Sequence, residues 1–198
     1  MHKGDLRTVL ELAKAAPDEA DAVETPDGRR YGMRRLDPGI ELSAAEGEWS
    51  RVLWFPPVDE RPSALPEDIP FLPGLDTTVT VRKKKLLTQW ALPDVDPAKV
   101  ADAAFKRMKS QTPGASKHKK ASPPPGPSPE IVSRLDEQLT SLRGTLEGDG
   151  WGVEEEETRE VPFPMRRIVL IRAGNRREVA RGAIFGLPTI TMRELKTE

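Results

Sequence analysis

Cysteine is absent from this 198-residue chain. Its absence excludes disulfide bonds, thiolate metal sites and cysteine nucleophiles. Histidine is almost as scarce, with two residues in the chain. His2 stands at the amino terminus and His118 in a lysine-rich stretch, so neither is expected where a folded element would orient an imidazole for proton transfer.

Long apolar runs are also missing. No segment approaches the roughly 18 apolar residues that a membrane-spanning helix needs, and Asp5, Glu11 and Lys14 interrupt the place where a signal peptide would have its apolar core. Apolar residues make up 36% of the chain and charged residues 32%, a balance that supports a modest core. We therefore expect a soluble, cytoplasmic protein, with a position at the periphery of a membrane or of a large complex left open.

The usual catalytic motifs are not found. The glycine-containing segments lack the spacing of a nucleotide-binding loop, and none of the serines stands in a nucleophile elbow. A nucleophile, a base and a set of oxyanion donors cannot be assembled from what remains. We predict that the chain is not an enzyme and needs no cofactor or metal.

The acidic run 154–157, with Asp149 and Glu160 nearby, is the best candidate for a site that binds a hard cation. On a strand, however, neighbouring side chains point to opposite faces, so that only every second glutamate can converge on one ion. The spacing of a calcium-binding loop is missing as well. We expect instead an edge strand that is protected by its charge.

Charge is present in blocks, although the net charge is −1. Residues 1–81 contain 9 basic and 16 acidic residues, and residues 82–120 contain 11 basic and 3 acidic residues. Residues 130–161 contain 3 basic and 10 acidic residues, and residues 162–198 contain 8 and 3. The middle of the chain is therefore a basic segment between acidic neighbours.

Turn residues and apolar periodicity predict an α+β protein made of two small helix-plus-antiparallel-sheet units joined by a Lys/Pro-rich linker. The first unit, 1–110, is expected to contain a short amino-terminal helix, strands, a hairpin across 82–85 and a helix from about 97. The linker is placed at 111–128, and the second unit, 129–198, is predicted to be a helix followed by an antiparallel meander. In outline the order is βββα, linker, αβββ.

Local signals place the elements of the second unit. Ser128 at the cap and Pro129 at the first helical position mark the start of its helix, and leucines recur on one face after it. Residues 166–172 contain a continuous apolar run typical of a central strand, and Gly174 with Asn175 is expected to supply the positive φ angles of a tight hairpin.

One basic cluster has the composition of a binding site. Its lysines and arginines are candidates for contacts with an anionic partner, either the phosphates of nucleic acid or anionic lipid head groups. The alternative is that they form a solvated hairpin tip and keep a linker expanded. The candidate residues are Arg82, Lys83, Lys84, Lys85, Lys106, Arg107, Lys109, Lys117, Lys119 and Lys120.

These observations favour two functions. The first is a non-enzymatic accessory or assembly subunit that binds a larger protein partner through edge strands and charged surface patches. The second is an electrostatic binder of nucleic acid or of an anionic membrane surface through the basic segment 82–120. The identity of the partner does not follow from the residues.

Overall fold

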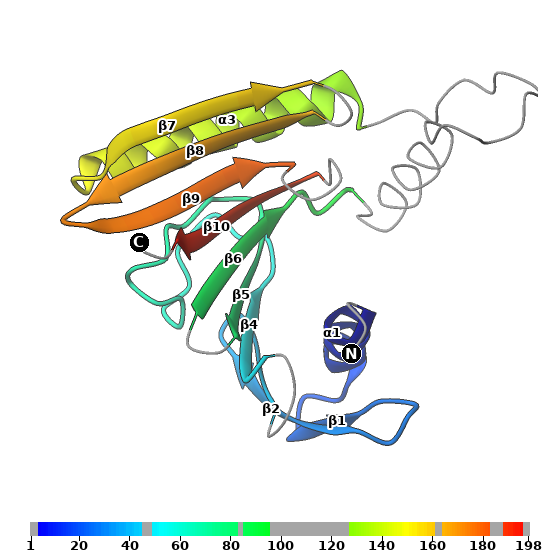
Figure 1. The fold of residues 1–198 in the computed structure, drawn as a ribbon. Coiled ribbons are helices and arrows are strands. Elements are labelled where there is room, and N and C mark those ends of the chain that lie inside the picture. The colour runs from blue at the N-terminus through cyan, green and yellow to red at the C-terminus, as the bar shows by residue number, and fades with distance from the viewer. Residues whose placement is uncertain are drawn as a thin grey trace, which may run out of the picture. The chain divides into compact units, whose positions relative to one another are not determined.

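The computed structural model describes residues 4–44, 49–82, 85–95, 127–160, 164–182 and 188–195. This part of the chain contains two helices and ten strands, so the protein is mixed α+β with strands predominating. The chain divides into two compact units, Met1–Trp90 and Ala91–Glu198 (Figure 1).

The first unit begins with helix α1 (Gly4–Ala15), as predicted, and continues into antiparallel strands. Its strands follow one another in space in the order of the sequence. They are β1 (Ala22–Glu24), β2 (Arg30–Leu36), β3 (Gly39–Ser43), β4 (Arg51–Phe55), β5 (Asp76–Arg82) and β6 (Lys85–Ala91).

The core of the first unit lies between α1 and strands β1 to β4. Val9 and Ala13 of α1 have no exposed surface, and they belong to one buried cluster with Ile40, Leu42 and Val52. Register explains the choice of residues, because Leu42 pairs with Val52 and Ile40 with Trp54. Paired residues on neighbouring strands point to the same face of the sheet, and here that face is covered by the helix.

The sequence undercounts the strands of this unit, because three strands were expected and six are present. The missed strands, β1 to β3, lie among turn residues. β2 and β3 are joined at Asp37–Pro38, a cis peptide bond, followed by Gly39 at a φ of 131°. A Cβ at Gly39 would collide with the backbone carbonyl of Trp54, so that β3 can lie against β4 only with glycine at this position.

The second unit contains helix α3 (Pro129–Gly148), which begins where its start signal predicts. The Ser128 side chain accepts a hydrogen bond from the backbone N–H of Ile131 at 3.3 Å, and Pro129 opens the first turn. Leu135, Leu139 and Leu142 are at most 2% exposed, and Leu146 is also buried, which confirms the predicted apolar face.

Four antiparallel strands follow α3 in this unit, in the spatial order β10-β9-β8-β7. They are β7 (Gly152–Arg159), β8 (Met165–Arg172), β9 (Asn175–Arg181) and β10 (Thr189–Leu195). The predicted meander is therefore confirmed with four strands, and β8 is an interior strand as its apolar run indicates.

The hairpin between β8 and β9 differs from its prediction by one residue. Ala173 and Gly174 have positive φ angles of 48° and 80°, and Asn175 already pairs with Arg172. The buried pair Ile168 and Val179 sets this register, because a shift by one residue would turn both side chains to the opposite face. Ala173 therefore adopts a left-handed backbone conformation, which asparagine adopts more easily than alanine.

The predicted helix from about 97 and nearly all of the linker 111–128 lie outside the described residues. The predicted domain boundaries at 110 and 129 therefore stay predictions. Neither described helix is long and apolar enough to cross a membrane.

Candidate functional site

Strand β7 is the first strand of the second unit in the sequence and lies at the end of the strand order, where it pairs with β8 along one side. Within the described ranges no strand pairs with its other side. It is eight residues long, and all of its residues except Glu157 are exposed. An edge of this kind presents unpaired backbone N–H and C=O groups, which are the groups that another strand would bind.

One irregularity interrupts the ladder between β7 and β8. Val153 pairs with Leu170 and Glu155 with Val169, so that Glu154 has no partner and forms a bulge. A bulge increases the local twist of an edge strand and hinders indiscriminate pairing. From Glu155 to Arg159 the pairing with β8 is regular.

The face of the sheet that points away from α3 carries a row of charges that alternate in sign from strand to strand. A Glu155 oxygen lies 3.1 Å from Nη1 of Arg167, and Arg167 donates from Nε to Glu178 at 2.7 Å. Arg193 donates to the other oxygen of Glu178 at 2.8 Å. The row crosses β7, β8, β9 and β10, and we call it the outer ladder.

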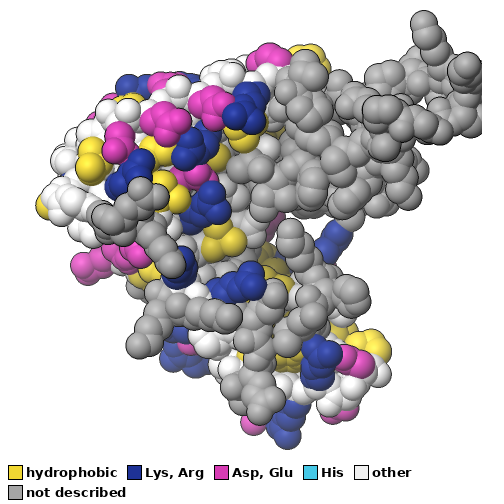
Figure 2. All heavy atoms as spheres, in the orientation of Figure 1, with side chains coloured by type: hydrophobic (Ala, Val, Ile, Leu, Met, Phe, Trp, Pro, Cys, Tyr) yellow, Lys and Arg dark blue, Asp and Glu magenta, His cyan; other side chains and the backbone are white. Residues whose placement is uncertain are grey.

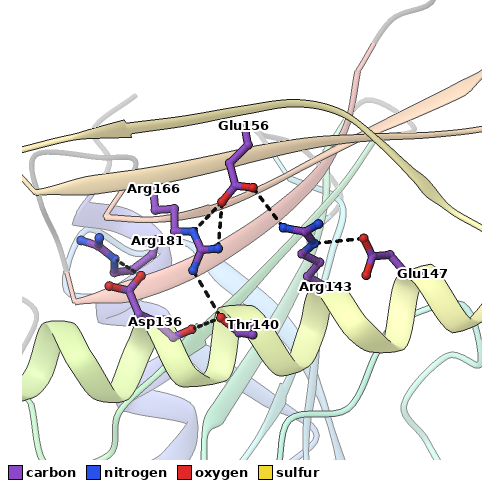
Figure 3. Close-up of polar contacts among 7 residues, drawn as sticks. All are labelled: Asp136, Thr140, Arg143, Glu147, Glu156, Arg166 and Arg181. Carbon is purple, nitrogen blue, oxygen red and sulfur yellow. Dashed lines mark hydrogen bonds and ion pairs between the residues drawn. The ribbon is translucent and has the colours of Figure 1, made fainter.

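The opposite face is linked to α3 by a second polar network (Figure 3). Arg166 of β8 donates from Nε to Glu156 of β7 at 2.9 Å and from Nη1 to the Thr140 hydroxyl of α3 at 3.3 Å. Arg143 of α3 donates to the second oxygen of Glu156 at 3.0 Å and from Nε to Glu147 at 3.0 Å. Glu156 therefore joins the edge strand, its neighbour and the helix.

A third contact closes the same face farther along the helix. Arg181 of β9 donates from Nε to Asp136 of α3 at 2.9 Å, and the Arg181 side chain is 4% exposed. A guanidinium buried to this degree needs its carboxylate, because a buried charge without a partner is strongly destabilising. The contact thus fixes α3 against the sheet.

Glu178 lies in the centre of the outer ladder between two arginines. Burial by itself would raise the pKa of Glu178, but hydrogen bonds from Arg167 and Arg193 outweigh it and hold the pKa below its ordinary value. Glu178 is therefore ionised at neutral pH and binds both neighbouring strands through charge-assisted hydrogen bonds.

The glutamates of β7 are engaged by arginines. Besides the contacts of Glu155 and Glu156, Glu154 accepts from Arg176 at 2.7 Å and Glu157 accepts from Arg159. The part of the chain that the structure describes holds no group of three or more His, Cys, Asp or Glu side chains able to bind a metal ion. Each of these four glutamates therefore has at least one arginine as a neighbour.

The beginning of β7 is different, because it is apolar. Val153 and Ile171 are 37% and 39% exposed, and they are the large hydrophobic side chains that stand out as exposed in the described residues. Gly152 pairs with Ile171, and a Cβ at Gly152 would have ordinary contact at 3.9 Å with one backbone oxygen. The side chain of Ile171 therefore lacks a neighbour on β7.

Figure 2 shows basic, acidic and apolar side chains interleaved over the part of the surface that carries this sheet. Sequence reasoning predicted the acidic edge but missed the arginines that engage it. The sequence contained a signal for them, since six arginines lie within 166–181, shortly after the five glutamates of 154–160. Strand order was needed to pair them.

The basic cluster is described only at two positions. Arg82 is the last residue of β5 and Lys85 the first residue of β6, and both are exposed. The other candidates lie outside the described residues, so the structure does not bring them together. They are Lys83, Lys84, Lys106, Arg107, Lys109, Lys117, Lys119 and Lys120.

A smaller charged cluster lies at the end of α1 in the first unit. Lys14 Nζ is 4.3 Å from the centre of the Trp54 ring and 3.3 Å from Glu11. Burial raises the pKa of Asp76, in spite of the attraction of Lys14 and a hydrogen bond with Trp54. This cluster ties α1 to β4 and β5 and has no further group suited to proton transfer among the neighbours described.

Comparison with known proteins finds no matching family model, no matching curated protein and no matching solved structure.

Proposed function

We propose that this protein is a non-enzymatic accessory or assembly subunit that binds an extended segment of a larger protein along the edge of β7. Two α+β units joined by a Lys/Pro-rich linker make up the subunit, and it acts in the cytoplasm or at the periphery of a membrane or large complex. Addition of a strand to an open sheet edge is a common mode of peptide recognition, in which backbone hydrogen bonds supply much of the affinity.

The observation that carries the proposal is the eight-residue edge of β7, with which no described strand pairs, on a sheet whose strands are joined by the outer ladder. The outer ladder and the contacts with α3 tie β7 to strands and helix behind it. An edge that is already ordered loses little conformational entropy when a segment binds, and this favours affinity.

Self-pairing is a competing use of the same edge, and the sequence of β7 opposes it. If β7 paired antiparallel with β7 of a second copy about its centre, glutamates of residues 154–157 would face glutamates. Like charges directly opposite each other destabilise a strand pair. The edge is therefore suited to a different chain.

Site-specific photo-crosslinking in the native cell tests the proposal. A photoreactive amino acid replaces Thr158 on β7, and the matched control places it at Ser133 on α3, which is exposed as well. We expect a discrete crosslinked protein from position 158 that is absent from position 133. Recovery of uncrosslinked monomer alone, or the same products from both positions, contradicts the proposal.

The second candidate function is electrostatic binding of nucleic acid or an anionic membrane through 82–120. The charge of that segment supports it, together with the exposure of Arg82 and Lys85. Binding of the full chain to duplex DNA and to vesicles of anionic phospholipid is measured at two salt concentrations. We expect affinity to fall steeply with salt if this function is real. If the protein does not bind, or binds with an affinity that does not depend on salt, this second function is excluded.

A further inference from the structure

On the outer face of the second unit the charges alternate from strand to strand, and the alternation stops at β7 with a carboxylate. On the outer face the order is Arg193, Glu178, Arg167 and Glu155. On the face that α3 covers, Arg166 of β8 precedes Glu156 of β7. Because Glu155 and Glu156 are neighbours on one strand, both faces of the sheet end in an acidic group at the middle of the edge.

These two carboxylates have capacity for another donor. The Glu155 side chain is 52% exposed and lies near one described arginine, and the Glu156 side chain is 34% exposed. An ionised carboxylate offers about four lone-pair positions. A cationic side chain opposite either residue on an added strand continues the alternation, whereas an acidic side chain there is destabilising.

The apolar start of β7 adds a second requirement. Ile171 is exposed beside Gly152, which has no side chain to cover it. A strand added next to β7 can direct one of its side chains across Gly152 onto Ile171. An aromatic side chain that lies over a glycine of the neighbouring strand is known to stabilise sheets.

We propose that the segment bound by β7 is cationic and extended, with Lys or Arg next to Glu155 and Glu156 and an apolar or aromatic side chain next to Gly152. This inference rests on the proposed function, which it deepens by naming the chemistry of the partner. A second copy of β7 does not fit, since it is acidic at the positions where cations are required.

Synthetic peptides test the inference with the full-length protein. The probe is a fluorescent nine-residue peptide of alternating Thr and Val with two adjacent central lysines and a terminal phenylalanine, blocked at both ends. Three control peptides replace the lysines by glutamine, replace a central residue by proline, or scramble the order. Affinity is measured by fluorescence polarisation at low and high salt, and amide hydrogen exchange locates the peptide.

We expect the lysine peptide to bind at least ten-fold more tightly than the glutamine, proline and scrambled peptides, and to slow exchange in β7. Glu155→Gln is expected to weaken binding several-fold, and Glu155→Lys to be rescued by a peptide with glutamate in place of lysine. Glu137→Gln is the matched control, because it removes an exposed carboxylate of α3 that is not part of the network around Glu156. Ile171→Ser is expected to abolish the advantage of phenylalanine over threonine at the peptide end.

The outcomes separate the inference from the function on which it rests. If the glutamine peptide binds as tightly as the lysine peptide and protects β7, strand addition stands and the cationic partner is wrong. Crosslinking from position 158 without any binding of the lysine peptide leads to the same conclusion. If the scrambled and proline peptides bind as well as the ordered one and β7 is not protected, both proposals fail.

Discussion

The two units of this protein hold partly or fully buried carboxylates in opposite ways. In the first unit, Asp76 is half-buried, and burial raises its pKa in spite of a hydrogen bond from Trp54 and the attraction of Lys14. In the second unit, Glu178 is held by two guanidinium groups, and its pKa is lowered in spite of burial. The comparison shows that the cost of burying a charge depends on how many charge-assisted donors surround it.

The same difference extends to the whole of each unit. The first unit is stabilised by an apolar layer between α1 and its strands, with most of its ion pairs at the exposed surface. The second has a leucine stripe on α3 and also ladders of charge on both faces of its sheet. Every cation in the described part of the second unit is an arginine, whereas most lysines of the chain lie between 83 and 120. Arginine is the better residue for planar, two-pronged contacts with carboxylates.

The largest effect on stability is expected in the leucine face of α3, where the second unit is held by apolar packing as the first unit is. Leu139→Ala removes a side chain of α3 that has no exposed surface. We expect a loss of about 3 kcal/mol in the free energy of unfolding, from lost burial and the cavity that remains. Urea denaturation measures it, with Glu137→Ala on the exposed side of α3 as the control. A loss below about 1 kcal/mol would mean that the helix is held mainly by its polar contacts.

The next effect concerns the contact between α3 and β9. Asp136→Ala leaves the buried guanidinium of Arg181 without the carboxylate that engages it. We expect a loss of about 2 kcal/mol, because an uncompensated buried charge costs more than an exposed pair contributes. The double variant Asp136→Ala with Arg181→Met should recover part of the loss. If both variants are equally unstable, the charge on Arg181 is not the cause.

Neutralising Glu178 and neutralising Asp76 are expected to change the stability of the protein in opposite directions. Glu178→Gln should lower stability at pH 7 by about 1.5 kcal/mol, because two charge-assisted hydrogen bonds are weakened. Asp76→Asn should leave stability unchanged or raise it, because the environment of Asp76 favours the neutral form. Thermal unfolding of both variants beside the wild type checks the signs. A loss of stability in both variants contradicts the comparison.

The pH dependence follows from the same two shifts. The lowered pKa of Glu178 provides stability that is fully present above its unfolded value of about 4.5 and is lost as the pH falls through the folded pKa. The raised pKa of Asp76 has the reverse effect, since the folded state binds the proton more tightly than the unfolded state. Its destabilisation grows as the pH rises from about 3.8 through the folded pKa. Glu178→Gln should flatten the acid limb of the stability curve, and Asp76→Asn should steepen it.

The smallest effect is expected on the exposed side of α3. A Cβ at Gly144 would meet no atom within 4 Å. Gly144→Ala should therefore stabilise the protein by about 0.5 to 1 kcal/mol, since alanine loses less entropy in a helix than glycine. Urea denaturation is the measurement, and Gly39→Ala is the contrasting variant, because there a Cβ collides with the backbone. Destabilisation by Gly144→Ala would show that the outer side of α3 is closely packed in solution.

Local signals predicted the elements whose reasons are themselves local. Ser128 and Pro129 start α3, the leucine spacing gives its buried face, and the apolar run within 166–172 gives the interior strand β8. Strands β1 to β3 were missed because turn residues dominate that part of the sequence, and their pairing depends on α1 covering one face.

The sequence by itself determined the kinds of element, the acidic character of 154–160 and the absence of cysteine chemistry, because propensity, capping and charge are properties of neighbouring residues. Tertiary structure alone decided which arginines lie against the glutamates of β7, and that the pKa values of Glu178 and Asp76 shift in opposite directions. Contacts such as Arg181 with Asp136 join residues far apart in the chain, and only strand order and register bring such groups within hydrogen-bond distance.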